Sequence, residues 1–356
     1  MNASPVFRFL MANWLWRHKL MRFLLYSFLF ASGFVMLVCL IPLHAENPHE
    51  LILDPAKVVG HEECARCHLA EVATWKQTPH HFTFEELHRK PEAQAIADRM
   101  GERSIKRGQL CIQCHYTQQQ SGNRTKAVSG ISCESCHGPA QDWIGLHNDY
   151  GGAGVSRENE SESHRAERLD TCLRLGMRNP DNLYLVARSC FNCHTVPQEK
   201  LVNVGGHKAG SADFELVAWS QGKVRHNFLR SNGANNHVSP QPRLRVMYVV
   251  GLLTDLEYSL RSLGNATEFK QFALQNALRI ARLRKRLKDV HESVEQPAIE
   301  NAWTIATKVE LKLDNQTALR EAADQLAALT HEFAREETGE SLAGIDHLLP
   351  TPDHYK

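Results

Sequence analysis

The chain has 356 residues, and its 41 Lys and Arg nearly balance its 40 Asp and Glu, so the formal net charge is +1 at pH 7. This balance argues against nucleic acid as a partner, because phosphate backbones are bound mainly through an excess of positive charge. The chain is long enough for two domains. Its unusual feature is the presence of ten cysteines and 20 histidines.

The first 45 residues have the pattern of an export signal or a membrane anchor. Three basic residues at positions 17, 19 and 22 precede an uncharged run over residues 23–43, which is a positively charged segment followed by an apolar one. The run has the ~20 residues that a helix needs to cross a bilayer, which favours an anchor. Residues 43–45 (Leu-His-Ala) instead form an acceptable cleavage site for a signal peptidase. Cleavage and retention both place the remaining chain in the periplasm or an equivalent space, since basic residues stay on the cytoplasmic side.

Four copies of the pattern Cys-x-x-Cys-His follow. Two thiols at this spacing can add across the two vinyl groups of one porphyrin, and the histidine can then bind its iron. A lone cysteine pair could instead form a redox disulfide or half of a zinc site, but neither requires a histidine after each pair. Outside the motifs only Cys39 and Cys172 remain, so the chain has no disulfide framework.

The motifs therefore predict four covalently bound haems c. The attachment residues are Cys64 and Cys67, Cys111 and Cys114, Cys133 and Cys136, and Cys190 and Cys193, and the proximal iron ligands are His68, His115, His137 and His194.

The residues after the first and third motifs extend the pattern. The first motif is followed by Trp75 and then His80, and the third continues with Gly138 and Pro139 toward His147. In these features the segment resembles the tetrahaem cytochrome c-554 family, whose members carry electrons from hydroxylamine oxidoreductase. The resemblance implies that His80 and His147 are distal iron ligands, each serving a haem other than the one attached beside it.

The fourth motif departs from this resemblance, because residues 183–189 hold no histidine where one would be expected. Candidates follow the motif instead. His207 comes after a glycine pair and His226 stands in an Arg-His-Asn-Phe segment. Both resemble segments that approach a haem in larger multihaem cytochromes, which implies two further distal ligands. The neighbours of the second motif suggest no distal partner, so a five-coordinate haem is expected there as an alternative.

The number of histidines bound to each iron separates the functional hypotheses. If every iron has two histidines, no position is open for a substrate, and the protein is an electron carrier between redox partner proteins with no catalytic residues. One open iron would predict an oxidoreductase of small nitrogen compounds. A third hypothesis is a haem relay subunit of a membrane complex, in which a basic run over residues 279–288 faces an acidic partner. The sequence favours the carrier.

The predicted fold is mainly α with extensive irregular loops. Residues 46–242 are expected to form a tetrahaem cytochrome c domain, because this stretch is rich in Gly, Pro, Cys and His and poor in long amphipathic runs. Residues 243–356 show sustained helical periodicity and are expected to form a bundle of three or four helices. Since every motif and candidate ligand precedes residue 242, the first region is expected to keep its haems without the second.

Overall fold

The computed structural model describes residues 51 and 53–356. The predicted export signal or anchor, residues 1–45 with the apolar run 23–43, lies outside the described residues. Within the described part of the chain no helix has the length and hydropathy needed to cross a bilayer.

The described residues are mainly helical, which confirms the predicted fold class. Short helices joined by long loops make up the region of the haem motifs, and the only sheet in the described residues is one antiparallel hairpin. These elements are α2 (His61–Ala65), α3 (Leu69–Trp75), α4 (Pro79–Glu86), η1 (Leu87–Arg89), α5 (Pro91–Met100), α6 (Gln109–His115), β1 (Thr117–Ser121), β2 (Arg124–Ser129), α7 (Cys133–His137), α8 (Glu162–Arg174), α9 (Leu183–His194), α10 (Glu199–Asn203), α11 (Leu216–Ser220) and η2 (Leu229–Ser231).

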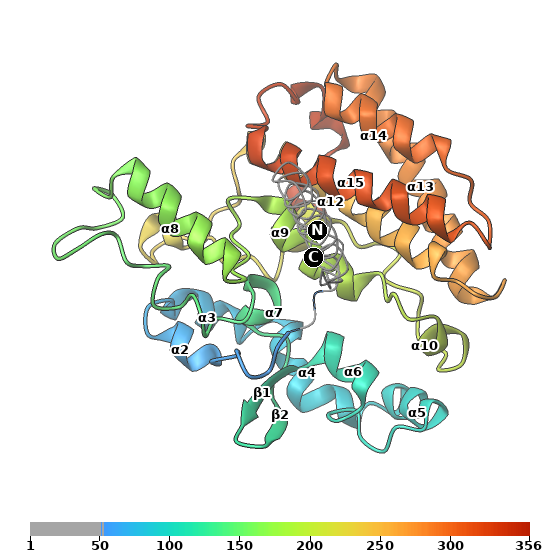
Figure 1. Cartoon of the computed structure of the whole chain (residues 1–356), viewed down its shortest axis with the longest axis horizontal. Coiled ribbons are helices and arrows are strands. Elements are labelled where there is room, and N and C mark those ends of the chain that lie inside the picture. The colour runs from blue at the N-terminus through green and yellow to red at the C-terminus, as the bar shows by residue number, and fades with distance from the viewer. Residues whose placement is uncertain (1–50, 52) are drawn as a thin grey trace, which may run out of the picture. The chain divides into compact units, whose positions relative to one another are not determined.

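Four long helices follow and pack together as a bundle (Figure 1). They are α12 (Gln241–Gly264), α13 (Gln271–Ser293), α14 (Pro297–Lys308) and α15 (Gln316–Glu336), and the chain ends with η3 (Ala343–Leu348) and η4 (Pro352–His354). α12 is buried along almost its whole length, because α13 and α15 from the bundle and α9 from the motif region all pack against it. A helix that is apolar around most of its circumference can be stable only in such a central place.

The apolar residues spaced at the helical period over residues 269–290 lie on one buried face of α13, with one exception. Phe272, Ile280, Leu283 and Leu287 are buried, but Phe269 precedes the helix and is 77% exposed.

The core of the bundle extends across residue 242 into the region of the haem motifs. Leu183, Tyr184, Ala187 and Phe191 of α9 belong to the same buried cluster as the bundle, together with α11 residues. Since α9 ends in the fourth motif, the bundle contributes to the position of that motif. The two-domain division at residue 242 stays a prediction, but the expectation that the first region keeps every haem alone no longer follows from the packing.

Candidate haem-binding site

Three of the four motifs occupy the last turn of a helix. α6 ends at His115, α7 consists of the third motif, and α9 ends at His194. The two cysteines are then about one turn apart on one face, and the histidine follows at the helix end. In the first motif α2 ends before the second cysteine, and His68 begins α3 as its N-cap residue. The thiols and the imidazole of each motif are thus positioned by local helical geometry.

Each motif histidine lies opposite one of the four distal candidates. The ring centroids are separated by almost the same distance in every case. The pairs are His68 and His147 at 6.3 Å, His80 and His194 at 6.3 Å, His115 and His207 at 6.3 Å, and His137 and His226 at 6.1 Å.

This separation suits two imidazoles that bind one metal ion from opposite sides. A metal bond to imidazole nitrogen is about 2.0–2.1 Å long, and the ring centroid lies about 1.1 Å beyond that nitrogen, so the centroids should be about 6.3 Å apart. His207 faces the second motif, for which the sequence suggested no distal partner. His80 and His147 each face a motif other than the neighbouring one in the chain.

His80 is held in place from three sides. Thr78 caps α4 by accepting a hydrogen bond from the His81 amide, and Pro79 occupies the first turn, as is common at helix N-termini. The His80 carbonyl accepts a hydrogen bond from Ile131 N at 3.1 Å. Gly130 lies so close to this carbonyl that a Cβ there would collide with it.

His147 is held by a buried ion pair. The Arg168 guanidinium donates to the His147 carbonyl at 2.6 Å and to both carboxylate oxygens of Glu160 at 2.6 and 2.7 Å. Arg168 therefore fixes the backbone of the histidine, and Glu160 fixes Arg168. A bidentate pair of this kind is among the more directional contacts in proteins.

The Nδ1 atoms of several paired histidines are already hydrogen-bonded. Nδ1 lies 2.6 Å from Ile144 O in His147, 2.8 Å from Lys208 O in His207 and 2.7 Å from Val224 O in His226. A carbonyl oxygen can only accept, so Nδ1 carries the proton in these rings and Nε2 presents its lone pair. This is the tautomer in which a histidine binds metal through Nε2.

Burial also favours the neutral imidazole that metal binding requires. Desolvation lowers the pKa of His115, His137 and His194 to about 4, with smaller contributions from the paired histidines. The pKa values of His80 and His147 are lowered as well, chiefly by the same desolvation. A neutral ring in a dry site can bind a cation without first losing a proton.

Buried donors beside the histidine pairs fit a bound haem. Trp143 packs on His147 and Trp219 on His194, and Tyr116 directly follows His115. The indole N–H of each tryptophan and the hydroxyl of Tyr116 are buried without a hydrogen-bond partner. Buried donors normally have partners. The propionate groups of a haem are acceptors that could supply them, so the residues present fit this group.

The motifs are adjacent in the order first, third, fourth, second. The Cys133 thiol lowers the pKa of Cys64, and the Cys193 thiol lowers the pKa of Cys114, so the thiols of each pair are neighbours. Between the third and fourth motifs, the Ser189 hydroxyl donates to the Cys136 carbonyl at 3.1 Å. Haems attached at these cysteines would therefore follow one another in a single row.

Two positioning residues have no signal in the sequence. Glu134, between the cysteines of the third motif, is buried and accepts hydrogen bonds from the backbone amides of Val59, Gly60 and Ala140 at 2.8–3.0 Å. Glu134 thereby connects the segment that precedes the first motif to the third motif. Arg178 donates to the Ser189 hydroxyl at 2.6 Å, and its carbonyl lies 3.3 Å from His137 Nδ1. Neither role follows from a spacing or a periodicity.

Comparison with known proteins covers part of this site. The family described as cytochrome c554 and c-prime matches residues 63–138, which contain the first three motifs. Cytochrome c-554 of Nitrosomonas europaea is 31% identical over 102 residues, or 26% of this chain and 43% of that protein. The resemblance to the cytochrome c-554 family is confirmed for this segment. The chain thus spans less than half the length of this curated relative, and no solved structure matches it.

The matched segment holds three of the four haem-attachment motifs and one of the four distal candidates, His80. The family match ends at residue 138. The fourth motif, three of the four distal candidates and the bundle lie after it, and their roles rest on the geometry described above.

Proposed function

We propose that the protein is a tetrahaem c-type cytochrome that transfers electrons between redox partner proteins outside the cytoplasmic membrane. The supporting observation is the equal separation of the four histidine pairs, 6.1–6.3 Å between ring centroids. Four histidine pairs with unrelated roles would have no reason to share this value.

The chain's residues would act as ligands and as electrostatic surroundings. Each motif would hold one haem through two thioether bonds, and each histidine pair would supply both axial ligands. Two imidazoles stabilise both oxidation states of iron without a large change of geometry, which suits one-electron transfer. The hydrogen bonds from Nδ1 to carbonyl oxygens orient the rings and strengthen them as ligands.

The row of motifs supports transfer along the molecule. Neighbouring motifs have thiols or backbone groups in contact, so haems attached there would be close enough for successive one-electron steps. The first and second motifs would lie at the two ends of this row, and electrons would enter near one and leave near the other.

The alternative of an open second haem has less support. His207 lies opposite His115 at the same distance as the other pairs. The site would then offer no free position for nitric oxide, hydroxylamine or nitrite. We therefore do not propose an oxidoreductase of small nitrogen compounds, and assign no catalytic residue.

Spectroscopy of the holoprotein, combined with its intact mass, tests the proposal. We expect a mass increase of four haems and four low-spin irons by magnetic resonance. Replacing His207 with Ala should convert one iron to high spin, because the axial ligand controls the spin state. The matched variant His237→Ala changes a histidine that lies opposite no motif histidine in the structure, and should leave all four low spin. A high-spin iron in the unaltered protein would contradict the proposed ligation.

A further inference from the structure

Several large apolar side chains are exposed where α10 meets the start of α13. Phe269 is 77% exposed, Val204 53%, Leu278 45% and Leu274 38%. Phe269 and Leu274 line a common hollow with Asn203, the neighbour of Val204. Single exposed apolar residues are ordinary, but a group of them on one surface commonly marks an interaction site.

Basic side chains surround this apolar group. Leu274, Leu278, Arg282 and Lys285 follow one another at helical spacing on α13 and are all exposed, so they form one stripe on its outer face. No acidic residue occurs in α13 before Asp289. Lys208 and Lys270 are also exposed beside the stripe.

Only part of the basic run predicted over residues 279–288 faces outward. Arg279 is buried in an ion pair with Asp255, Arg284 donates to Val309 O at 2.6 Å, and Arg286 lies over the Tyr248 ring. Arg282, Lys285 and Lys288 are exposed, so the outward positive charge is concentrated on one strip of the helix.

Two acidic residues lie at the edge of this area, and both have partners. Glu199 accepts hydrogen bonds from Thr267 and from the Glu268 amide. Glu268 forms an ion pair with Lys270 at 2.5 Å. Glu199 thereby fastens α10 to the loop before α13, and the surface keeps an excess of positive charge on α13.

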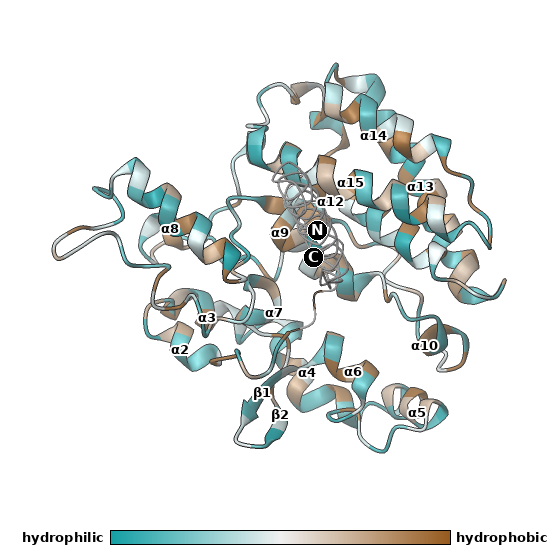
Figure 2. Ribbon diagram, in the orientation of Figure 1, coloured by the Kyte–Doolittle hydropathy of each residue, from teal (hydrophilic) through white to brown (hydrophobic). Residues whose placement is uncertain are grey.

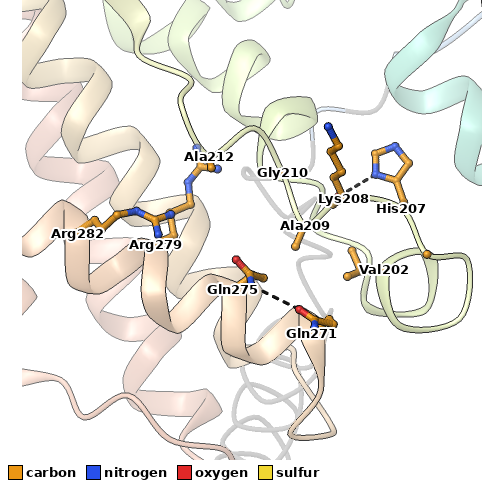
Figure 3. A pocket seen from close by; sticks show the side chains of 11 residues that line it. Val202, His207, Lys208, Ala209, Gly210, Ala212, Gln271, Gln275, Arg279 and Arg282 are labelled. Carbon is orange, nitrogen blue, oxygen red and sulfur yellow. Dashed lines mark hydrogen bonds between the residues drawn. The ribbon is translucent and has the colours of Figure 1, made fainter.

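The loop that carries His207 forms one wall of a pocket of about 370 Å³, and α13 forms the other (Figure 3). Lys208 and Gly206 line the first wall, and Gln271, Gln275 and Arg282 line the second. The imidazole of His207 lies opposite His115 of the second motif. A protein bound on this surface would therefore lie near the end of the proposed electron path.

We propose that the α10–α13 surface docks an acidic electron-transfer protein. The surface comprises the exposed apolar residues Val204, Phe269, Leu274 and Leu278 and the exposed basic residues Lys208, Lys270, Arg282 and Lys285. The inference rests on the proposed electron-carrier function. One electron crosses between the partner and the second motif's haem, so that one is oxidised as the other is reduced, and no bond or proton is exchanged.

The surface chemistry favours such a partner over a second copy of the chain. A copy would bring the same basic strip against itself, and like charges across an interface disfavour association. An acidic protein has complementary charge, which accelerates encounter. A small apolar centre with a charged rim is also typical of transient complexes between redox proteins.

Stopped-flow reduction of the holoprotein by flavodoxin hydroquinone, an acidic one-electron donor, tests the proposal. The double variant Arg282→Glu with Lys285→Glu should slow the second-order rate about tenfold or more at low ionic strength, since steering is electrostatic. Phe269→Ser should slow it several-fold through the lost apolar contact. Added salt should slow the reduction of the unaltered protein by flavodoxin and bring its rate toward that of the charge variant.

Matched controls change the same residue types elsewhere. Lys308→Glu alters an exposed lysine of α14, and Val128→Ser alters an exposed apolar residue of β2. Both should keep the rate within about twofold of the unaltered protein. Every variant should also be reduced at the unaltered rate by dithionite at high ionic strength, because this small reductant needs no docking surface and salt screens the changed charges.

Equal flavodoxin rates in the surface variants and the controls would overturn the docking inference and leave the carrier proposal intact. The inference would also be overturned if the charge variant lost binding to phosphatidylserine vesicles, or a dimer seen by sedimentation, while keeping its flavodoxin rate. Absence of four haems, or no reduction by dithionite, would instead reject the carrier proposal itself.

Discussion

The bundle and the region of the first three haem motifs bury apolar surface in different ways. In the bundle one continuous cluster of buried side chains runs from α9 and α11 through α12, α13, α14 and α15 to η3. Around the first three motifs the buried side chains form only two small clusters, one of Ala97, Ile105, Ile112 and Tyr116 and one of Ala140, Trp143 and Cys172. Figure 2 shows the bundle helices carrying hydrophobic residues among hydrophilic ones along their length.

This difference indicates what each region needs in order to fold. Helices with a shared side-chain core are stabilised by burial of their own apolar faces. Short helices with few buried neighbours must obtain apolar contacts from elsewhere, and porphyrin rings would provide them. A cofactor that binds only the folded state stabilises that state by mass action. The order of the motif region should thus depend on haem, whereas that of the bundle should not.

Synthesis without haem attachment should produce the largest effect. We expect the apoprotein to keep slow amide exchange in α12, α13 and α15, while α2 to α7 lose protection by on the order of a thousandfold relative to the holoprotein. Hydrogen exchange followed by mass spectrometry would measure both regions in one sample. Protected amides in α2 to α7 of the apoprotein would show that the motif region folds without haem.

Truncation after Pro242 tests whether the bundle is needed by the fourth motif. Removal of residues 243–356 would uncover Leu183, Tyr184 and Phe191 of α9, each of which is now buried. Exposing such side chains costs about 1.5–3 kcal/mol each. We expect the truncated protein to lose the haem at Cys190 and Cys193, in contrast to what the sequence alone suggested. An intact mass with four haems would show that α9 needs no bundle.

Asp255→Asn tests the buried ion pair that joins α12 to α13. Asp255 accepts two hydrogen bonds from Arg279 at 2.6 and 2.9 Å, and both side chains are 6% exposed. Arg279 also donates to the Ser211 carbonyl, and the Ser211 hydroxyl lies 3.4 Å from His194 Nδ1. An unpaired buried Arg279 should cost about 3–5 kcal/mol in unfolding free energy.

The control is Asp324→Asn, because Asp324 pairs with Arg261 but is 56% exposed. Exposed pairs contribute about 0–1 kcal/mol. Denaturant unfolding would compare the variants, and a redox titration of the Asp255 variant should show one haem potential raised by the uncompensated charge near His194. Equal stability of the two variants would contradict the role given to this pair.

The smallest expected effect is a change in the acid dependence of stability, through Asp346 of η3. Hydrogen bonds from Arg245 and Gln241 lower the pKa of Asp346 to about 2, from an ordinary value of 3.8. Since the pKa is lower in the folded state, this pair stabilises the fold above pH 4, and its contribution is lost as the pH falls from about 4 to about 2. Asp346→Asn should flatten the stability profile in that window only, as measured by thermal unfolding at several pH values. An unchanged profile would show that the pair contributes nothing.

The sequence predicts the helices better than it predicts the contacts between distant parts of the chain. The mainly helical fold and the amphipathic helices follow from local patterns, because helical periodicity is visible in a short window. The partnership of His207 with His115 could not be predicted, since the two positions are 92 residues apart in the sequence and His207 lies in a loop with no regular structure. Phe269 fitted the apolar period of α13 and yet lies outside the helix, because the chain turns into α13 only at Gln271.

The contacts between cysteines of different motifs bear on how the protein is assembled. In the folded chain Cys64 lies beside Cys133, and Cys114 beside Cys193. In an oxidising compartment a chain that folded before modification would hold these thiols ready for disulfide formation between motifs, and a disulfide there would block two attachment sites at once. Attachment must therefore precede tertiary folding, or a reductant must keep the thiols reduced. Without such a reductant, the fold itself requires thioether formation on a largely extended chain, with collapse afterwards.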